Sequence, residues 1–180
     1  YQTGKYPYEN LIGGDGMQIQ IDKRNPNIVF TGFQFGNYYR IDRANNKRDY
    51  ISPVQKKGEK PFRYNWQTPI LLSSHNQEIL YMGSNFLHRS MNQGQTWTAI
   101  SPDLTQGAKE GNVAFGTIAA ISESPLQFGL LYTGSDDGLV HVSKDGGATW
   151  NIMSGNLPQN RWISRVVASA HKKERVYVTL

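Results

Sequence analysis

The stretch Ser143-Lys144-Asp145-Gly146-Gly147-Ala148-Thr149-Trp150 decides how this sequence of 180 residues folds, because its residue types specify a tight turn followed by a strand. A short carboxylate such as Asp145 can accept N–H bonds inside its own turn, and Gly147 can take the positive φ that such a turn requires. Trp150 opens the next strand, where its ring is expected to be buried beside a neighbouring sheet. We therefore predict a β-hairpin whose turn residues are structural rather than catalytic.

A second copy of the pattern, residues 90–97, ends 53 residues before the first, at Trp97. It keeps the serine, glycine, threonine and tryptophan positions, and an asparagine that can still close an Asx-turn replaces the aspartate. The hydroxyls on either side of each turn can hydrogen-bond across the hairpin. The residues assigned to this structural role are Ser90, Asn92, Gly94, Thr96, Trp97, Ser143, Asp145, Gly147, Thr149 and Trp150. The corresponding stretch 39–45 lacks the glycine and the tryptophan, and we predict an irregular loop there.

An independent repeat runs through the chain in register with these hairpins. Similar apolar motifs with a central aromatic residue occupy 28–33, 79–84 and 130–135, and a fourth begins at 175. The aromatic residues at positions 30, 81 and 132 are 51 residues apart in each step. A period near 50 is typical of propeller blades or solenoid coils.

Each repeat divides into four short strands punctuated by Gly, Pro and Asp, and no window shows the apolar stripe of an amphipathic helix. First strands are predicted at 17–21, 68–72, 117–121 and 164–168. The predicted fold is all-β, with about three and a half consecutive four-stranded antiparallel blades at 13–62, 63–110, 111–160 and 161–180. A propeller needs about four to eight blades, so we expect an incomplete ring whose partner is the remainder of its own chain.

The two hairpin motifs resemble the Asp-box, Ser-x-Asp-x-Gly-x-Thr-Trp, and nearly the whole chain is similar to the large BNR or sortilin-like propeller proteins of bacteria. The stretches 13–16, 62–69 and 100–104 fit that group as well. The resemblance implies a secreted or cell-surface protein whose propeller binds a glycan or a protein or peptide ligand. Members of the group often carry a glycosyl hydrolase label, but a fold alone does not fix function.

Composition excludes several classes of function. Without cysteine the chain has no disulfide, thiolate zinc site or cysteine nucleophile. No apolar run is long enough to span a membrane. The net charge is +5, yet the basic groups around Lys56 and Lys172 are interrupted by acidic residues, so no nucleic-acid partner is expected. No phosphate-loop or dinucleotide motif precedes a helix, and no cofactor is expected.

The four histidines fall into two pairs of repeat-equivalent positions. His88 and His141 each precede a hairpin serine by two residues, and His75 and His171 each precede a strand tyrosine by six. Equivalent positions in separate blades perform the same structural task and do not converge on one ion. No metal site is therefore predicted.

Three carboxylates are candidates for acid–base chemistry. Glycoside hydrolysis usually needs two carboxyl groups about 5 to 10 Å apart. Asp15 precedes a first strand, and Asp136 and Asp137 connect a second strand to a third, so all three are expected at the same end of the blades. Each also lies beside glycine, and turn formation is the favoured interpretation.

The same end of the blades is expected to gather aromatic and basic side chains. Such groups can stack on sugar faces and hydrogen-bond hydroxyls, although inter-blade core is an alternative for about half of the aromatic residues, first of all Trp66 and Phe115. We favour a glycan- or protein-binding and scaffolding module; the alternative is part of a glycoside hydrolase. The candidate ligand-binding residues are Arg63, Tyr64, Trp66, Arg161 and Trp162.

Overall fold

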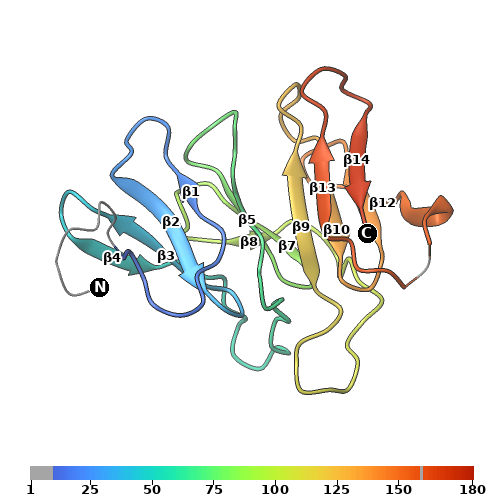
Figure 1. Ribbon diagram of the computed structural model, residues 1–180, viewed down its shortest axis with the longest axis horizontal. Helices are drawn as coiled ribbons and strands as arrows, with labels where there is room; N and C mark the ends of the chain where they lie inside the picture. The colour runs from blue at the N-terminus through green and yellow to red at the C-terminus, as the bar shows by residue number, and fades with distance from the viewer. Residues whose placement is uncertain (1–9, 159) are drawn as a thin grey trace, which may run out of the picture.

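The computed structural model describes residues 10–158 and 160–180, which contain strands, turns and one short 3-10 helix, η1 (Ser154–Asn156). Three four-stranded antiparallel sheets follow one another along the chain, and a two-stranded sheet comes last (Figure 1). Within each sheet the strands are in chain order. This confirms the prediction of consecutive four-stranded antiparallel blades.

The strands of the four sheets are the following. The first sheet holds β1 (Gln20–Ile21), β2 (Ile28–Phe33), β3 (Asn37–Asp42) and β4 (Lys47–Tyr50). The second holds β5 (Ile70–Leu72), β6 (Leu80–Gly83), β7 (Leu87–Ser90) and β8 (Thr98–Ala99). The third holds β9 (Ile118–Glu123), β10 (Leu131–Ser135), β11 (Val140–Ser143) and β12 (Asn151–Ile152). The last holds β13 (Arg165–Ala168) and β14 (Val176–Thr179).

The turn from each first strand to its second strand has the same local design. Asp22 and Ser73 accept the backbone N–H of the residue two positions later, at 2.8 and 3.2 Å. Ser124 and Ser169 do the same at 3.3 and 3.2 Å. A short side-chain acceptor closes such a turn without help from the rest of the fold. This fourfold feature was absent from the sequence prediction.

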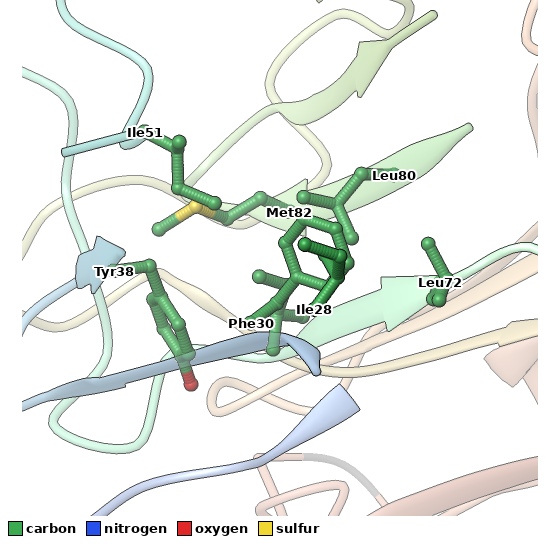
Figure 2. Close-up of a cluster of buried hydrophobic side chains, with 8 residues drawn as sticks. Ile28, Phe30, Tyr38, Ile51, Leu72, Leu80 and Met82 are labelled. Carbon is green, nitrogen blue, oxygen red and sulfur yellow. The ribbon is translucent and has the colours of Figure 1, made fainter. Parts of the chain in front are cut away.

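Apolar side chains fill the space between successive sheets. Phe30 and Tyr38 of the first sheet pack against Leu80 and Met82 of the second, and all four are fully buried (Figure 2). The Tyr38 hydroxyl donates to the Thr68 carbonyl at 2.8 Å, so a hydrogen bond also connects the first sheet to the segment that leads into the second. Because the second sheet is covered on both sides, every residue of β6 is buried.

The remaining interfaces repeat this arrangement. Tyr81 and Leu87 of the second sheet join Ile118 and Leu131 of the third in one cluster, and Tyr132 and Val166 belong to another between the third sheet and the last. Neighbouring sheets thus pack face to face, and Figure 1 shows them side by side from the first to the last without closing into a ring. The arc is an incomplete set of propeller blades.

The β11–β12 hairpin is held by Asp145. Its carboxylate accepts the Thr149 backbone N–H at 2.9 Å and the Thr149 hydroxyl at 2.6 Å, and the Ser143 hydroxyl donates to it at 2.8 Å. These bonds hold the pKa of Asp145 at about 2. Ser143 also accepts the Gly147 N–H at 2.8 Å. The hydroxyls of Ser143 and Thr149 therefore both donate to the Asp145 carboxylate in the centre of the turn.

The β7–β8 hairpin has the same bonds with an amide in the central position. Asn92 accepts the Thr96 N–H and the Ser90 hydroxyl, both at 2.9 Å, and its amide donates to the Thr96 hydroxyl at 2.9 Å. Ser90 accepts the Gly94 N–H at 2.8 Å. An asparagine therefore replaces the aspartate without loss of the turn.

Each of these hairpins is bonded to the preceding sheet through its tryptophan. The Trp150 indole N–H donates to the Ile100 carbonyl at 2.9 Å, and the Trp97 indole N–H donates to the Ile51 carbonyl. Ile51 and Ile100 follow the fourth strands of the first and second sheets. These inter-blade indole bonds join each hairpin to the end of the blade before it.

Arginines of the third strands make a second connection. Arg40 donates to the Gln93 side chain at 2.9 Å, and Arg89 donates to the Gly146 carbonyl at 3.0 Å. Gln93 and Gly146 occupy equivalent positions in the turns of the β7–β8 and β11–β12 hairpins. Each of these hairpins therefore donates an indole N–H to the preceding blade, and its turn accepts a guanidinium N–H from that blade.

The loop between β3 and β4 corrects the prediction of an irregular connection. Asp42 accepts the N–H groups of Ala44 and Asn45 at 3.1 and 3.2 Å, and Asn46 has a φ of 50°. The strands pair without interruption up to Asp42 and Lys47. The first hairpin is regular because an Asx-turn and a left-handed asparagine replace the missing glycine.

Gly147→Ala is expected to destabilise the fold by roughly 2 to 4 kcal/mol. Gly147 has a φ of 100°, and an added Cβ would lie 2.7 Å from the Ile100 carbonyl oxygen. Gly155→Ala is the control, since nothing lies within 4 Å of its Cβ position, and its effect should stay within about 1 kcal/mol. Urea unfolding, monitored by tryptophan fluorescence, measures the free energy of unfolding of both variants. Equal destabilisation by the two substitutions would contradict the close packing of Gly147.

Candidate functional site

The loops that precede the first strands lie at the same end of the blades as the connections between second and third strands. Backbone bonds join them across neighbouring blades: Phe35 N–H to Trp66 O at 3.2 Å, Ile118 N–H to Ser84 O at 2.7 Å, and Ile163 N–H to Ser135 O at 3.1 Å. We call this the loop end. In Figure 1 the long connections before β5 and β9 project together at the bottom.

The Asp145 and Asn92 turns lie at the opposite end, together with the turns between first and second strands. Gly146 N–H donates to Gly129 O and Gln93 N–H donates to Glu78 O, both at 2.9 Å. We call this the hairpin end. The loop end is therefore free of the hairpins that hold the blades together.

Asp136 lies at the loop end but is buried and fully bonded. Its carboxylate accepts the Thr117 N–H at 2.9 Å, the Thr117 hydroxyl at 2.6 Å and the Asn65 amide at 3.4 Å. Its side chain is 4% exposed, and this burial raises its pKa. The bonds connect the second and third blades, so Asp136 orders the start of β9.

Asp137 is also buried and hydrogen-bonded within the protein. It is 2% exposed, accepts the Gln106 N–H at 2.6 Å and receives the Ser135 hydroxyl at 2.5 Å. The Gln106 amide also donates to its backbone carbonyl at 2.7 Å. Asp137 therefore fastens the loop before β9 over the β10–β11 turn.

Asp15 differs from the other two carboxylates because it is exposed. It accepts the Gln34 amide at 2.5 Å, and an added Cβ on the adjacent Gly14 would touch Phe33. Asp15 thus lies against the β2–β3 turn at the loop end of the first blade. Of the three candidates, Asp15 alone presents its carboxylate to solvent.

Arg63 and Tyr64 are bound within the protein. The Arg63 guanidinium donates to Gly116 O at 3.0 Å, Asp103 at 2.8 Å and Thr105 at 2.9 Å. The Tyr64 hydroxyl donates to Pro53 O at 2.7 Å, and burial raises its pKa. Both residues join loops of neighbouring blades, and these contacts leave few of their polar groups for a ligand.

Trp66, a candidate ligand-binding residue, is exposed, so the alternative that placed it in the inter-blade core is wrong. Its side chain is 48% exposed and forms an edge-to-face pair with Phe35, with ring centroids 5.2 Å apart. Phe35 is 39% exposed and has a φ of 58°, which is uncommon for a bulky residue. Local strain of this kind concentrates at functional sites.

The last blade presents a second aromatic residue at the same end. Trp162 is 49% exposed and Arg161 is also exposed. The Arg161 backbone lies close to Gly138, where an added Cβ would be 3.0 Å from the Arg161 carbonyl oxygen. Phe115, in contrast, is half-buried beneath the Lys109 ammonium, 4.2 Å from its centroid.

The histidines have the structural roles that their positions indicate. His88 and His141 are buried on equivalent third strands, and His75 and His171 donate their backbone N–H groups to equivalent serines. Within the described ranges no group of three or more His, Cys, Asp or Glu side chains is arranged to hold a metal ion.

No protein-family model matches this sequence, and no curated protein matches it. Many solved structures are similar in fold, and three of them serve as examples. An ancestral GH74 enzyme has a TM-score of 0.65 and 18% identity over 92% of this chain and 22% of its own. The GH74 xyloglucanase from Xanthomonas campestris gives 0.60 and 18% over 82% and 24%. An extracellular domain from B. thetaiotaomicron gives 0.57 and 14% over 91% and 20%.

The fold is that of a β-propeller. The chain spans about a fifth to a quarter of the length of these structures, so the similarity extends to a few blades of much larger proteins. At such low identity the likeness concerns the arrangement of the blades.

His88 is expected to make stability depend on pH between 6.5 and 4. Burial lowers its pKa to about 4 from an ordinary 6.5, so the unfolded chain takes up the proton first as the pH falls. Stability is then full above pH 6.5 and falls toward pH 4 by roughly 3 kcal/mol. The urea midpoints of the wild type and of His88→Gln, measured at several pH values between 6.5 and 4, test this. The difference between the two midpoints should change with pH. Parallel curves would contradict it.

Proposed function

We propose that this chain is part of an Asp-box β-propeller that binds a glycan at its loop end. The observation that carries the proposal is the exposed edge-to-face pair of Phe35 and Trp66 at that end. The equivalent bonding of the β7–β8 and β11–β12 turns, in which a serine hydroxyl accepts the glycine N–H, supports the assignment of both as Asp-boxes. These turns stabilise the blades from the other end and leave the loop end to the ligand.

The geometry of the pair favours a sugar. A Trp ring can stack on the apolar face of a pyranose, and a second ring at a steep angle fixes how the sugar lies. The two rings meet at an interplanar angle of 77°. The half-buried Gln34 and the exposed Asp15, which bond to each other at the same β2–β3 turn, keep a further donor and further acceptors for hydroxyl groups. Trp162 offers a further stacking position along the same end.

Glycoside hydrolysis is the second candidate, favoured by the fold it shares with GH74 enzymes. Of the three candidate carboxylates, Asp136 and Asp137 have their oxygens engaged in ordering loops, which leaves Asp15 as the available one. A hydrolase needs a second carboxyl group opposite the first. Binding is therefore the function that these blades support best by themselves.

We further propose that the protein works outside the cell, at the surface or in the medium. One similar structure is an extracellular domain. No helix in the described ranges is long and apolar enough to cross a membrane. Detection of the native protein in the culture medium or on intact cells would test this location.

The glycan site predicts a selective effect of removing aromatic rings. Trp66→Ala should raise the Kd for xyloglucan oligosaccharides by about fivefold to tenfold, since one stacking contact contributes about 1 to 1.4 kcal/mol. Trp162→Ala should have a smaller effect in the same direction. Isothermal titration calorimetry on the full chain measures each Kd.

Phe128→Ala is the matched control, because Phe128 is 49% exposed and lies at the hairpin end beside Gly129. Equal loss in Phe128→Ala and Trp66→Ala would contradict a loop-end site. Release of reducing ends that Asp15→Asn abolishes would instead support the hydrolase.

A further inference from the structure

A groove separate from the loop-end aromatic pair lies along the outer edge of the second blade. Its volume is about 770 Å³, which lies within the range of roughly 300 to 1,000 Å³ that is typical of ligand sites in proteins. One wall is the segment 53–63, which leads from the first blade to the second, and the other is the β8 strand with Trp97. Nothing in the proposed glycan site uses this groove.

The base of the groove is aromatic. Phe62 lies between Phe86 and His88, with centroid distances of 5.8 and 4.6 Å. His88 is only 2% exposed, and its Nε2 is 2.8 Å from the Ser84 hydroxyl. No other hydrogen bond of this ring occurs within the described residues, although the ring lines the groove. The base therefore combines a flat apolar surface with one unpartnered ring nitrogen.

The polar side chains at the inner end of the groove already bond to one another. Asp103 accepts Arg63 at 2.8 Å and Asn85 at 2.9 Å, and its other oxygen accepts the Thr105 hydroxyl at 2.7 Å. A sugar site needs polar side chains free to bind hydroxyl groups. These groups are not free, so the groove does not have the chemistry of a neutral-sugar site.

The rim of the groove carries two lysines and one glutamate, Glu59, so its net charge is positive. Lys56 and Lys60 line it, and no ion pair with either lysine occurs within the described part of the chain. The Glu59 carboxylate accepts the Lys56 backbone N–H at 3.2 Å and so folds the loop back on itself at Gly58, whose φ is 91°. Two ammonium groups beside an apolar base favour a ligand with carboxylates and apolar side chains.

The opposite wall offers backbone groups. β8 is the last strand of its sheet, and the Ile100 N–H donates to Leu87 O at 2.8 Å. Because antiparallel pairs alternate, the neighbouring Ala99 turns its N–H and C=O away from β7. An extended peptide can pair with such an edge, as in β-strand addition.

We propose that this groove binds an extended acidic peptide, which pairs with Ala99, places an apolar side chain against Phe62 and His88, and directs its carboxylates to Lys56 and Lys60. Edge pairing supplies main-chain recognition, the aromatic base selects an apolar residue, and the lysines select the charge. The partner is therefore an acidic segment of another protein.

The test uses the full chain and a fluorescein-labelled peptide, acetyl-Glu-Leu-Asp-Val-Glu-amide, in fluorescence anisotropy. The double variant Lys56→Glu/Lys60→Glu should weaken binding at least about tenfold, because it reverses both contacts to carboxylates. Lys172→Glu/Lys173→Glu makes the same charge change at the β13–β14 turn and should leave the affinity within about twofold. Equal weakening by both doubles would overturn the groove as the site.

A second probe tests the edge pairing without altering the protein. The same peptide N-methylated at its central residues lacks the N–H groups that pair with β8, and it should bind at least about tenfold more weakly. Unchanged affinity would overturn the edge pairing. Absence of binding at about 1 mM peptide, or binding of oligogalacturonate at the groove in its place, would overturn the peptide proposal.

Discussion

The hydrogen bond from the hairpin indole to the end of the preceding blade is the interaction on which the rest of the structure depends. Trp97 and Trp150 each make it, and Gly94 and Gly147 pack closely against the isoleucines whose carbonyls accept it. A two-residue outer strand such as β12 has too few ladder bonds to fix its own position. The indole bond and the bulk of the ring supply the missing connection.

The two ends of the blades carry different kinds of contact. The hairpin turns, the first-to-second-strand turns and the contacts of Arg40 and Arg89 lie at one end, and the longer loops before β5 and β9 lie at the opposite end. Buried Asp136 and Asp137 stabilise those loops from inside, while Phe35, Trp66 and Trp162 remain on the surface. A rigid scaffold with adaptable loops at one end is a common basis for ligand binding.

The sequence predicted those features that depend on local chemistry. The Ser143–Thr149 turn, the register of the repeat and the antiparallel blades follow from residue types a few positions apart. The roles of Arg63 and Tyr64 could not be read in this way, because their partners Gly116 and Pro53 come from other loops. For Trp66 the sequence left ligand binding and inter-blade core both open, because periodicity does not decide which of two adjacent loop residues is buried; the structure buries Asn65 and exposes Trp66.

Native-state hydrogen exchange on Trp150→Phe tests the central claim most directly, because the change keeps an aromatic ring and removes the indole N–H. The loss of one hydrogen bond of about 1 kcal/mol predicts roughly fivefold faster exchange in β7 and β11, on either side of that interface, with β2 unchanged. Uniform acceleration of all three strands, or none in any, would contradict the claim that this bond joins the second and third blades.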